Sequence, residues 1–150
     1  MNGDIALVKG QRNGKVRTRT RTIALLMCGW GVLTAADLMP FTSDGCSLFP
    51  DGTLKQRELW LVCCTEHDYA YWKGGTEAER IAADERLREC VAALGEPKIA
   101  KVMLSGVRAG GSPYLPTPFR WGYGWSYPRY YAPLSEEERA AVEAQADPKQ

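Results

Sequence analysis

The residues with the most obvious chemical potential lie in one short segment, Cys63-Cys64-Thr65-Glu66-His67-Asp68, which is followed by Tyr71. His67 is the only histidine among the 150 residues of the chain, and a carboxylate follows it directly. An imidazole can take up and release a proton near neutral pH, so it is suited to act as a general base. The position of this single histidine is therefore the first feature that a functional prediction has to explain.

Two helices are predicted to position this segment. Residues 54–72 contain neither glycine nor proline, which favours a first helix, and the Lys-Gly-Gly sequence at 73–75 ends it. Thr76 can cap a second helix that runs to Leu94, with Glu79 completing a capping box. Because the turn between the two helices is very short, we expect them to lie antiparallel and adjacent.

Each helix has a face that is predicted to be buried. On the first helix, residues spaced by four, three and four form one inward stripe, which consists of Trp60, Cys64, His67 and Tyr71. On the second helix, the apolar residues that define the buried face are Ile81, Leu87, Val91 and Leu94. Asp84 falls on that same face. A buried carboxylate without a partner would cost several kcal/mol, so Asp84 needs one.

Antiparallel packing makes His67 the partner that we expect for Asp84. Asp84 lies about two turns into its helix, and His67 about two turns before the end of the other. A carboxylate that accepts from one imidazole nitrogen fixes the tautomer and leaves the other nitrogen free as a base. Tyr71 could donate its hydroxyl to the same carboxylate. The alternative is a buried His–Asp–Tyr network that only stabilises the core.

The cysteines predict two disulfides. The part of the chain that can form a core is small, so it needs covalent staples. Cys63 and Cys64 point about 100° apart on a helix, so one should reach the second helix and the other the preceding loop. We pair Cys63 with Cys90 and Cys64 with Cys46.

The second of these bonds predicts a metal site. It would hold Asp44 and Gly45 beside Asp68, which brings together carboxylate and carbonyl oxygens, the hard ligands that Ca²⁺ prefers. A structural zinc site is the competing interpretation. It is disfavoured because two adjacent cysteines inside a helix do not chelate one ion well.

The N-terminal 36 residues are typical of a secretory leader. A basic stretch at 9–22 precedes an apolar run of fourteen residues, IALLMCGWGVLTAA, which ends in small residues. We predict a signal peptide or an N-terminal membrane anchor, and a buried N-terminal helix in a cytosolic protein is the alternative. Residues 37–150 contain 13 basic and 17 acidic residues, a net charge of about −4, which argues against nucleic acid as a partner.

Beyond the second helix, residues 98–107 predict a shorter third helix, and the stretch 110–134 is rich in proline, glycine and aromatic residues without periodicity. Its aromatic side chains suit either a satellite core over the helices, which we favour, or a lipid-interface surface; they are Tyr114, Phe119, Trp121, Tyr123, Trp125, Tyr127, Tyr130 and Tyr131. Arg108, Arg120 and Arg129 could contact phosphate. Ser135 is the expected cap of a solvated C-terminal helix.

Residues 64–71 resemble a known signature. Cys64, His67, Asp68 and Tyr71 match the Cys-x-x-His-Asp-x-x-Tyr pattern of the secreted phospholipase A₂ enzymes. The loop Asp44-Gly45-Cys46-Ser47 is more similar to the calcium loop of the bacterial and fungal members of that superfamily. The resemblance covers residues 43–94.

The resemblance implies a role for each of these residues. His67 would deprotonate the attacking water, Asp84 would orient the imidazole, and Tyr71 would support Asp84. Asp68, Asp44 and the Gly45 carbonyl would bind Ca²⁺, which stabilises the oxyanion when water attacks the sn-2 ester of a glycerophospholipid.

We therefore predict an all-α fold with two long, antiparallel, disulfide-linked helices, a calcium loop and an irregular aromatic C-terminal region. The leader would occupy residues 1–36, the phospholipase A₂-like domain 37–134, and a solvated helix or tail 135–150. The expected function is Ca²⁺-dependent phospholipid hydrolysis at a membrane or micelle surface by a secreted or periplasmic monomer. The alternative is a non-catalytic lipid- or protein-binding module on the same scaffold.

Overall fold

The computed structural model of the chain describes residues 37–146, and this part is all-α with two disulfides. Its helices are α1 (Leu61–Lys73), α2 (Glu77–Ala93), α3 (Pro97–Gly110) and α4 (Glu136–Ala146). The predicted leader at 1–36 and the last four residues of the predicted tail lie outside the described residues. Within the described part, no helix combines the length and the apolar character needed to cross a membrane.

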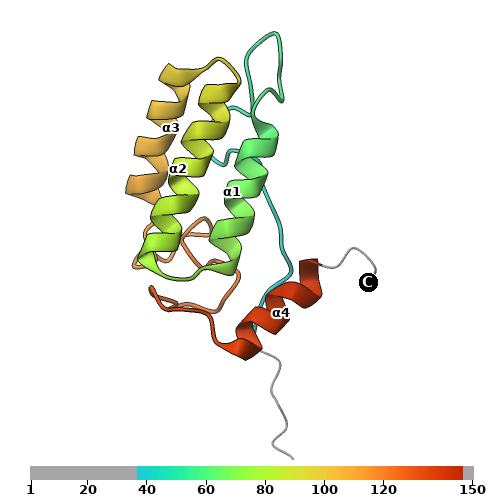
Figure 1. Cartoon of the computed structure of the whole chain (residues 1–150), viewed down its shortest axis with the longest axis vertical. Coiled ribbons are helices and arrows are strands. Elements are labelled where there is room, and N and C mark those ends of the chain that lie inside the picture. The colour runs from blue at the N-terminus through green and yellow to red at the C-terminus, as the bar shows by residue number, and fades with distance from the viewer. Residues whose placement is uncertain (1–36, 147–150) are drawn as a thin grey trace, which may run out of the picture. The chain divides into compact units, whose positions relative to one another are not determined.

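The first three helices form an antiparallel bundle in which α2 packs against both α1 and α3 (Figure 1). The predicted cap of α2 is present: Thr76 Oγ1 accepts from the Glu79 N–H, and Glu79 Oε2 accepts from the Thr76 N–H at 2.7 Å. The disulfide Cys63–Cys90 links α1 to α2. The predicted pair of adjacent, disulfide-linked helices is thereby confirmed.

The bounds of two helices differ from the prediction. α1 begins at Leu61 and not at residue 54, because residues 51–60 fold back in a series of turns. The Trp60 backbone N–H donates to the Asp51 carbonyl at 3.0 Å, and its indole Nε1 donates to the Pro50 carbonyl at 2.6 Å. These bonds close a loop that excludes a helix over the same residues. α3 has 14 residues against 13 for α1, so it is not the shorter helix that we expected.

The inward stripe of α1 is confirmed, since Trp60, Cys64, His67 and Tyr71 are all buried. The predicted face of α2 is only half right. Leu87 and Val91 are buried, but Ile81 and Leu94 are 43% and 41% exposed. The residues of α2 that are buried are Arg80, Ala83, Asp84, Leu87 and Val91. Arg80 and Asp84 can occupy the buried face of α2 because they have polar partners inside the bundle. Ile81 lies to one side of this face.

The aromatic stretch after α3 forms the satellite core that we favoured. Trp121 is 1% exposed, packs edge-on against Tyr71 and donates its indole N–H to the Gly75 carbonyl at 2.9 Å. Trp125 is also buried and donates to the Lys73 carbonyl at 2.7 Å. The stretch thus closes the α1–α2 end of the bundle. Tyr114, Tyr127 and Tyr130 remain exposed.

Two of the three arginines that could have contacted phosphate have structural roles at this end of the molecule. Arg120 is 5% exposed and donates to the carbonyls of Gly122 and Trp125, both at 2.6 Å. Arg129 forms an ion pair with Glu138 of α4 at 2.9 Å. Their guanidinium groups therefore hold the aromatic stretch and α4 in place.

The expectation of a solvated C-terminal helix is wrong for one side of α4. Ser135 does cap it, since its Oγ accepts from the Glu138 N–H at 3.2 Å. Val142 is only 7% exposed and belongs to the same apolar cluster as Trp72 and Trp125. A single apolar position in a helix rich in glutamate and alanine gives too weak a periodicity to predict this packing from the sequence.

The substitution Val142→Ala tests the packing of α4. Removing two buried methyl groups beside Trp72 and Trp125 should lower the free energy of unfolding by about 1–3 kcal/mol. Urea denaturation measures this change. The control is Glu143→Ala, at the exposed neighbouring position, which should stay within about 0.5 kcal/mol of the wild type. An equally small effect of Val142→Ala would show that α4 does not contribute to the core.

Candidate functional site

The structure brings His67, Asp84 and Tyr71 together between α1 and α2. His67 Nε2 lies 3.0 Å from Asp84 Oδ1, and the Tyr71 hydroxyl donates to the same oxygen at 2.7 Å. The exposed fractions are 8% for His67, 3% for Tyr71 and 0% for Asp84. Because the two helices are antiparallel and linked by the Cys63–Cys90 bond, residues 17 positions apart in the sequence meet inside the bundle.

The protonation of this group follows from its contacts. Burial, and next the charge of Asp84, raise the pKa of the Tyr71 hydroxyl, so the hydroxyl keeps its proton and donates it. The Asp84 carboxylate is an acceptor, so the imidazole nitrogen that faces it, Nε2, must carry a proton. In neutral His67 the lone pair is then on Nδ1, which has no hydrogen-bond partner among the described residues. This arrangement makes Nδ1 a free base.

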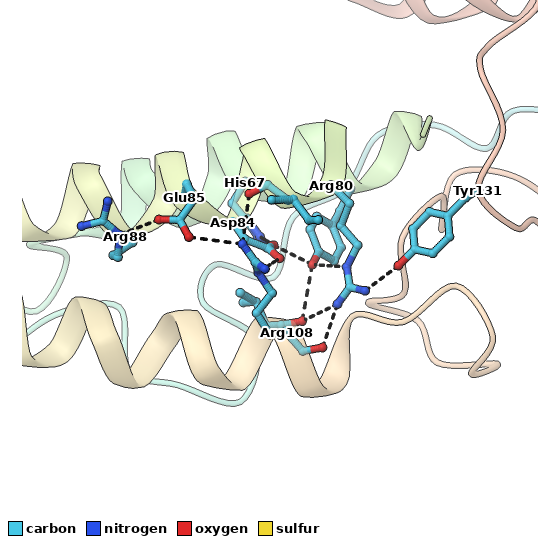
Figure 2. A network of polar contacts seen from close by, with 10 residues as sticks. His67, Arg80, Asp84, Glu85, Arg88, Arg108 and Tyr131 are labelled. Atoms are coloured by element: carbon cyan, nitrogen blue, oxygen red, sulfur yellow. Dashed lines mark hydrogen bonds and ion pairs between the residues drawn. The ribbon is translucent and has the colours of Figure 1, made fainter. Parts of the chain in front are cut away.

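Arg108 of α3 provides the cation for the buried carboxylate, and the sequence did not predict this. Its Nε lies 2.7 Å from Asp84 Oδ2. The two atoms do not form a hydrogen bond, so the contact is an ion pair only. A second nitrogen, Nη2, lies 3.2 Å from Glu85 Oε1. Figure 2 shows Arg108 reaching from α3 to Asp84 and Glu85 of α2.

Arg80 of α2 joins the same network to the aromatic stretch (Figure 2). Its Nε donates to the Tyr71 hydroxyl at 3.1 Å and its Nη1 to the Tyr131 hydroxyl at 2.6 Å. Its Nη2 donates to the carbonyls of Val107 and Arg108, at 3.0 and 2.9 Å. Arg80 thus satisfies carbonyls in the last turn of α3 and fixes the position of Tyr71. The sequence could have indicated this role, because Arg80 lies four residues before Asp84 and so on the same helix face.

The second disulfide holds the loop before α1 against that helix. Cys46 is bonded to Cys64, the pair that the sequence predicts. Asp51 supports the loop from inside, since its Oδ1 accepts from the Cys46 N–H at 2.8 Å. Gly45 has φ +76°, and a Cβ at this position would collide with the Asp51 carboxylate. Glycine is therefore required here by both the backbone and the space available.

The predicted metal ligands gather around this loop. Ser43 Oγ donates to Asp68 Oδ2 at 2.6 Å and accepts from the Gly45 N–H at 3.2 Å. The Asp44 carboxylate accepts from Ser47 Oγ at 2.9 Å. Asp44, Gly45 and Asp68 therefore belong to one polar cluster, in which the hydroxyls of Ser43 and Ser47 are additional oxygen donors.

The electrostatics of Asp68 fit a cation. Its pKa is raised to about 6. The largest cause is burial, to which the Asp44 carboxylate adds, and the Ser43 hydroxyl and His67 act in the opposite direction. Between residues 37 and 146, neither aspartate forms an ion pair with a basic side chain. The same range holds no group of three or more His, Cys, Asp or Glu side chains that could bind a metal. Calcium sites also use carbonyl, hydroxyl and water oxygens, so two carboxylates suit this ion.

His67 and Asp68 line a mainly apolar cavity of about 280 Å³, together with Ser47 and Tyr71. The cavity is bounded by the loop, α1, α2, α3 and the residues just after α3. Its apolar lining consists of Leu48, Phe49, Leu87, Val102, Met103, Val107 and Phe119, together with the glycines 106, 110 and 111. An apolar pocket that contains a few polar groups is typical of a binding site for a ligand with an apolar part.

Comparisons with protein-family models, with curated proteins and with solved structures find no match for this chain. The site is therefore interpreted from its own residues and geometry.

The substitution Arg108→Met tests the ion pair with Asp84. It leaves a buried carboxylate without its cation, so the free energy of unfolding should fall by about 2–4 kcal/mol, somewhat less than for a fully buried pair because Arg108 is partly exposed. Glu85→Gln is the control. It removes the exposed charge that Arg108 shares with Arg88 and leaves Asp84 with its cation, so it should change stability by less than about 1 kcal/mol. In urea denaturation, Arg108→Met and Asp84→Asn together should destabilise by less than the sum of the two. Additive effects would contradict the coupling.

Asp68 should make the metal-free protein less stable as the pH rises. Its pKa is about 6 in the folded state against 3.8 without the fold. The folded state therefore binds the proton more tightly, and this contribution to stability is complete below pH 3.8 and lost as the pH rises through 6. Asp68→Asn should then be more stable than the wild type at pH 8 by about 1–2 kcal/mol, after allowance for solvent screening, and equal to it near pH 4.

Urea denaturation in EGTA between these pH values measures the difference between Asp68→Asn and the wild type. Glu66→Gln, two residues earlier on the exposed side of α1, is the control and should show no such dependence. If Asp68→Asn differs from the wild type by the same amount at both ends of the pH range, the raised pKa is wrong.

Proposed function

We propose that this protein hydrolyses the sn-2 ester of glycerophospholipids with a water molecule activated by His67 and with Ca²⁺ as its cofactor. The observation that carries the proposal is the orientation of His67. Its Nε2 is held by Asp84, its Nδ1 has no hydrogen-bond partner among residues 37–146, and its side chain lines a mainly apolar cavity. The resemblance of residues 64–71 to the phospholipase A₂ signature supports the same reaction and a phospholipase A₂-like scaffold.

His67 acts as the base in this proposal. A water molecule at Nδ1 gives up its proton to the imidazole as its oxygen attacks the ester carbonyl. The imidazole then becomes a cation, and Asp84, 3.0 Å from Nε2, stabilises that charge. Tyr71 and Arg108 hold the carboxylate at its two oxygens, so Asp84 can neither rotate nor be lost to solvent. The proton on Nδ1 later passes to the leaving alkoxide of the lysophospholipid.

Asp68, Asp44 and the carbonyl of Gly45 would hold the calcium ion in this proposal. When bound, the ion supplies a Lewis acid that polarises the ester carbonyl and stabilises the negative charge on its oxygen. A backbone N–H of the loop would share this task. The N–H groups of Gly45 and Cys46 already donate to Ser43 and Asp51. The main chain of Ser47 and Leu48, which also line the cavity, provides the candidate donors.

The cavity and its surroundings suit a lipid substrate. Most of its lining is apolar, and His67 and Asp68 are among its few polar residues, so an acyl chain inside the cavity would have its ester near His67. Leu48 and Val102 border the cavity and are 92% and 57% exposed. These exposed apolar residues suit contact with a membrane or micelle surface. In this proposal the protein acts there as a monomer. The two disulfides agree with the proposed secreted or periplasmic location, where they are stable.

The lipid- or protein-binding module remains the second candidate function. It is favoured by the same exposed apolar residues at the cavity, which could bind a lipid without hydrolysing it. The two functions make different predictions for a single substitution at the base.

The substitution His67→Gln should abolish hydrolysis. Glutamine keeps a polar side chain in the cavity but cannot take up the proton, so release of fatty acid should fall at least about 100-fold. The assay follows fatty acid released by the full-length chain from vesicles of phosphatidylcholine and phosphatidylglycerol, in Ca²⁺ and in EGTA. We expect release by the wild type in Ca²⁺ only.

The exposed variant Glu66→Gln is the control for this assay and should hydrolyse normally. Asp68→Asn should lose both calcium binding and turnover. Unchanged hydrolysis by His67→Gln would refute the assignment of the base, and normal turnover in EGTA would refute the role of the metal. Vesicle binding without any release of fatty acid would favour the binding module.

A further inference from the structure

Gly106 lies inside α3 and Gly110 is its last residue, and the fold requires glycine at neither position. Glycine destabilises a helix interior relative to alanine, so its presence at Gly106 needs a local reason. Neither residue has the left-handed backbone that favours glycine. A Cβ at Gly106 would meet nothing within 4 Å, and one at Gly110 would meet only Phe119 Cε2, at an ordinary contact distance of 3.6 Å. By contrast, a Cβ at Gly111 would collide with the Tyr71 ring, so that glycine is required by packing.

Both glycines border the cavity that His67 also lines. They are four residues apart and therefore lie on one face of α3, and Val102, four residues earlier, continues that face along the cavity. His67 itself is 8% exposed and lines the same cavity, with Nδ1 free of any partner in the described part of the chain. Val102, Gly106 and Gly110 thus form one wall of the cavity that His67 lines.

The direction of this wall follows from the contacts of α3. Its last turn lies beside the His67–Asp84 pair, because the Tyr71 hydroxyl lies 3.4 Å from the Val107 carbonyl and Arg108 reaches Asp84. Met103 packs in the core cluster of Leu87 and Cys64, one turn farther along the bundle. The wall therefore leads away from His67 from Gly110 to Val102, over eight residues or about 12 Å.

We propose that Gly106 and Gly110 are specificity-determining residues that keep this wall open for an acyl chain, an inference that rests on the proposed function. The chain extends from the ester at His67 along α3, past Gly110 and then Gly106, toward Val102. A side chain at either glycine would occupy the space of the acyl chain. The cavity would then accept short chains, which end before Gly106, and exclude long ones.

If Gly106 keeps the wall open, replacing it with alanine should stabilise the helix and at the same time weaken the binding of long acyl chains. Gly106→Ala should raise the melting temperature by about 2–6 °C, because it adds a helix-favouring residue in open space. Gly106→Leu should fold as well, and circular dichroism with thermal melting measures both. If Gly106→Ala instead lowers the melting temperature, the position is restricted by packing, and the proposal is overturned.

Binding of saturated fatty acids tests the path of the chain. Octanoate, dodecanoate and hexadecanoate are titrated, below their aggregation concentrations, into the full-length protein in EGTA, and binding is followed by the fluorescence of its tryptophans or by NMR. The wild type should bind more tightly as the chain lengthens. Gly106→Leu should bind hexadecanoate at least tenfold more weakly and octanoate within threefold of the wild type. Gly106→Ala should show the same pattern to a smaller degree.

Ser105→Leu is the matched control. It adds the same side chain at the neighbouring position of α3, which is exposed, as Gly106 is, but does not line the cavity. Its affinity for all three fatty acids should equal that of the wild type. An equal loss in Ser105→Leu and Gly106→Leu would overturn the proposal, because the effect would then come from α3 as a whole.

Different results would overturn the role of the glycines and the hydrolysis of phospholipids. If Gly106→Leu binds every chain length as the wild type does, or if the wild type binds no fatty acid, the glycine proposal is overturned whatever the result of the vesicle assay. If the length-dependent loss is found but the wild type releases no fatty acid from vesicles in Ca²⁺, hydrolysis is overturned, and the glycines set the chain length in a lipid-binding cavity. In an active enzyme, Gly106→Leu should also shift hydrolysis toward phospholipids with short sn-2 chains.

Discussion

The arrangement of the helices depends on one buried charge. Asp84 is completely inaccessible to solvent, and an isolated carboxylate there would be prohibitively unstable. Its two oxygens collect His67 and Tyr71 from α1 and Arg108 from α3, while Asp84 itself belongs to α2. One carboxylate therefore contacts all three helices of the bundle. The contacts that make its burial tolerable are also those that fix the tautomer and orientation of His67.

The disulfides extend this constraint to the loop. A bundle of three short helices has a small apolar core, and the Cys63–Cys90 bond fixes α1 against α2. The Cys46–Cys64 bond then fixes the loop to a neighbouring face of α1, about 100° from that of Cys63 and one turn away from Asp68. Two adjacent cysteines on one helix thus determine both the partner of His67 and the surroundings of Asp68. This explains physically why the doubled cysteine precedes the histidine so closely.

The sequence predicted the features that follow from local rules and spacing. The capping box of α2, the inward stripe of α1, the two cysteine pairs and the meeting of His67, Tyr71 and Asp84 all follow from helical periodicity and a short turn. What it missed depends on contacts between distant segments. The start of α1 is set by the turns that bring Trp60 onto Pro50. Ile81 is exposed because Arg80 and Asp84 occupy the buried face of α2, where α3 provides their partners. Arg108 could not be assigned to Asp84, because nothing in the sequence gives the packing of α3 against α2.

Local rules of stability are broken at three places beside the cavity. A carboxylate is buried at Asp84, the Asp44 carboxylate lies close enough to raise the pKa of Asp68, and glycine occupies a helix interior at Gly106. Each of these lowers stability on its own, and they come from different elements: α2, the loop with α1, and α3. A sequence selected only for its fold would gain from replacing them. His67, Asp68 and Gly106 line the cavity, and Asp84 contacts His67 from behind it. The grouping of these residues at one cavity agrees with the function proposed for it.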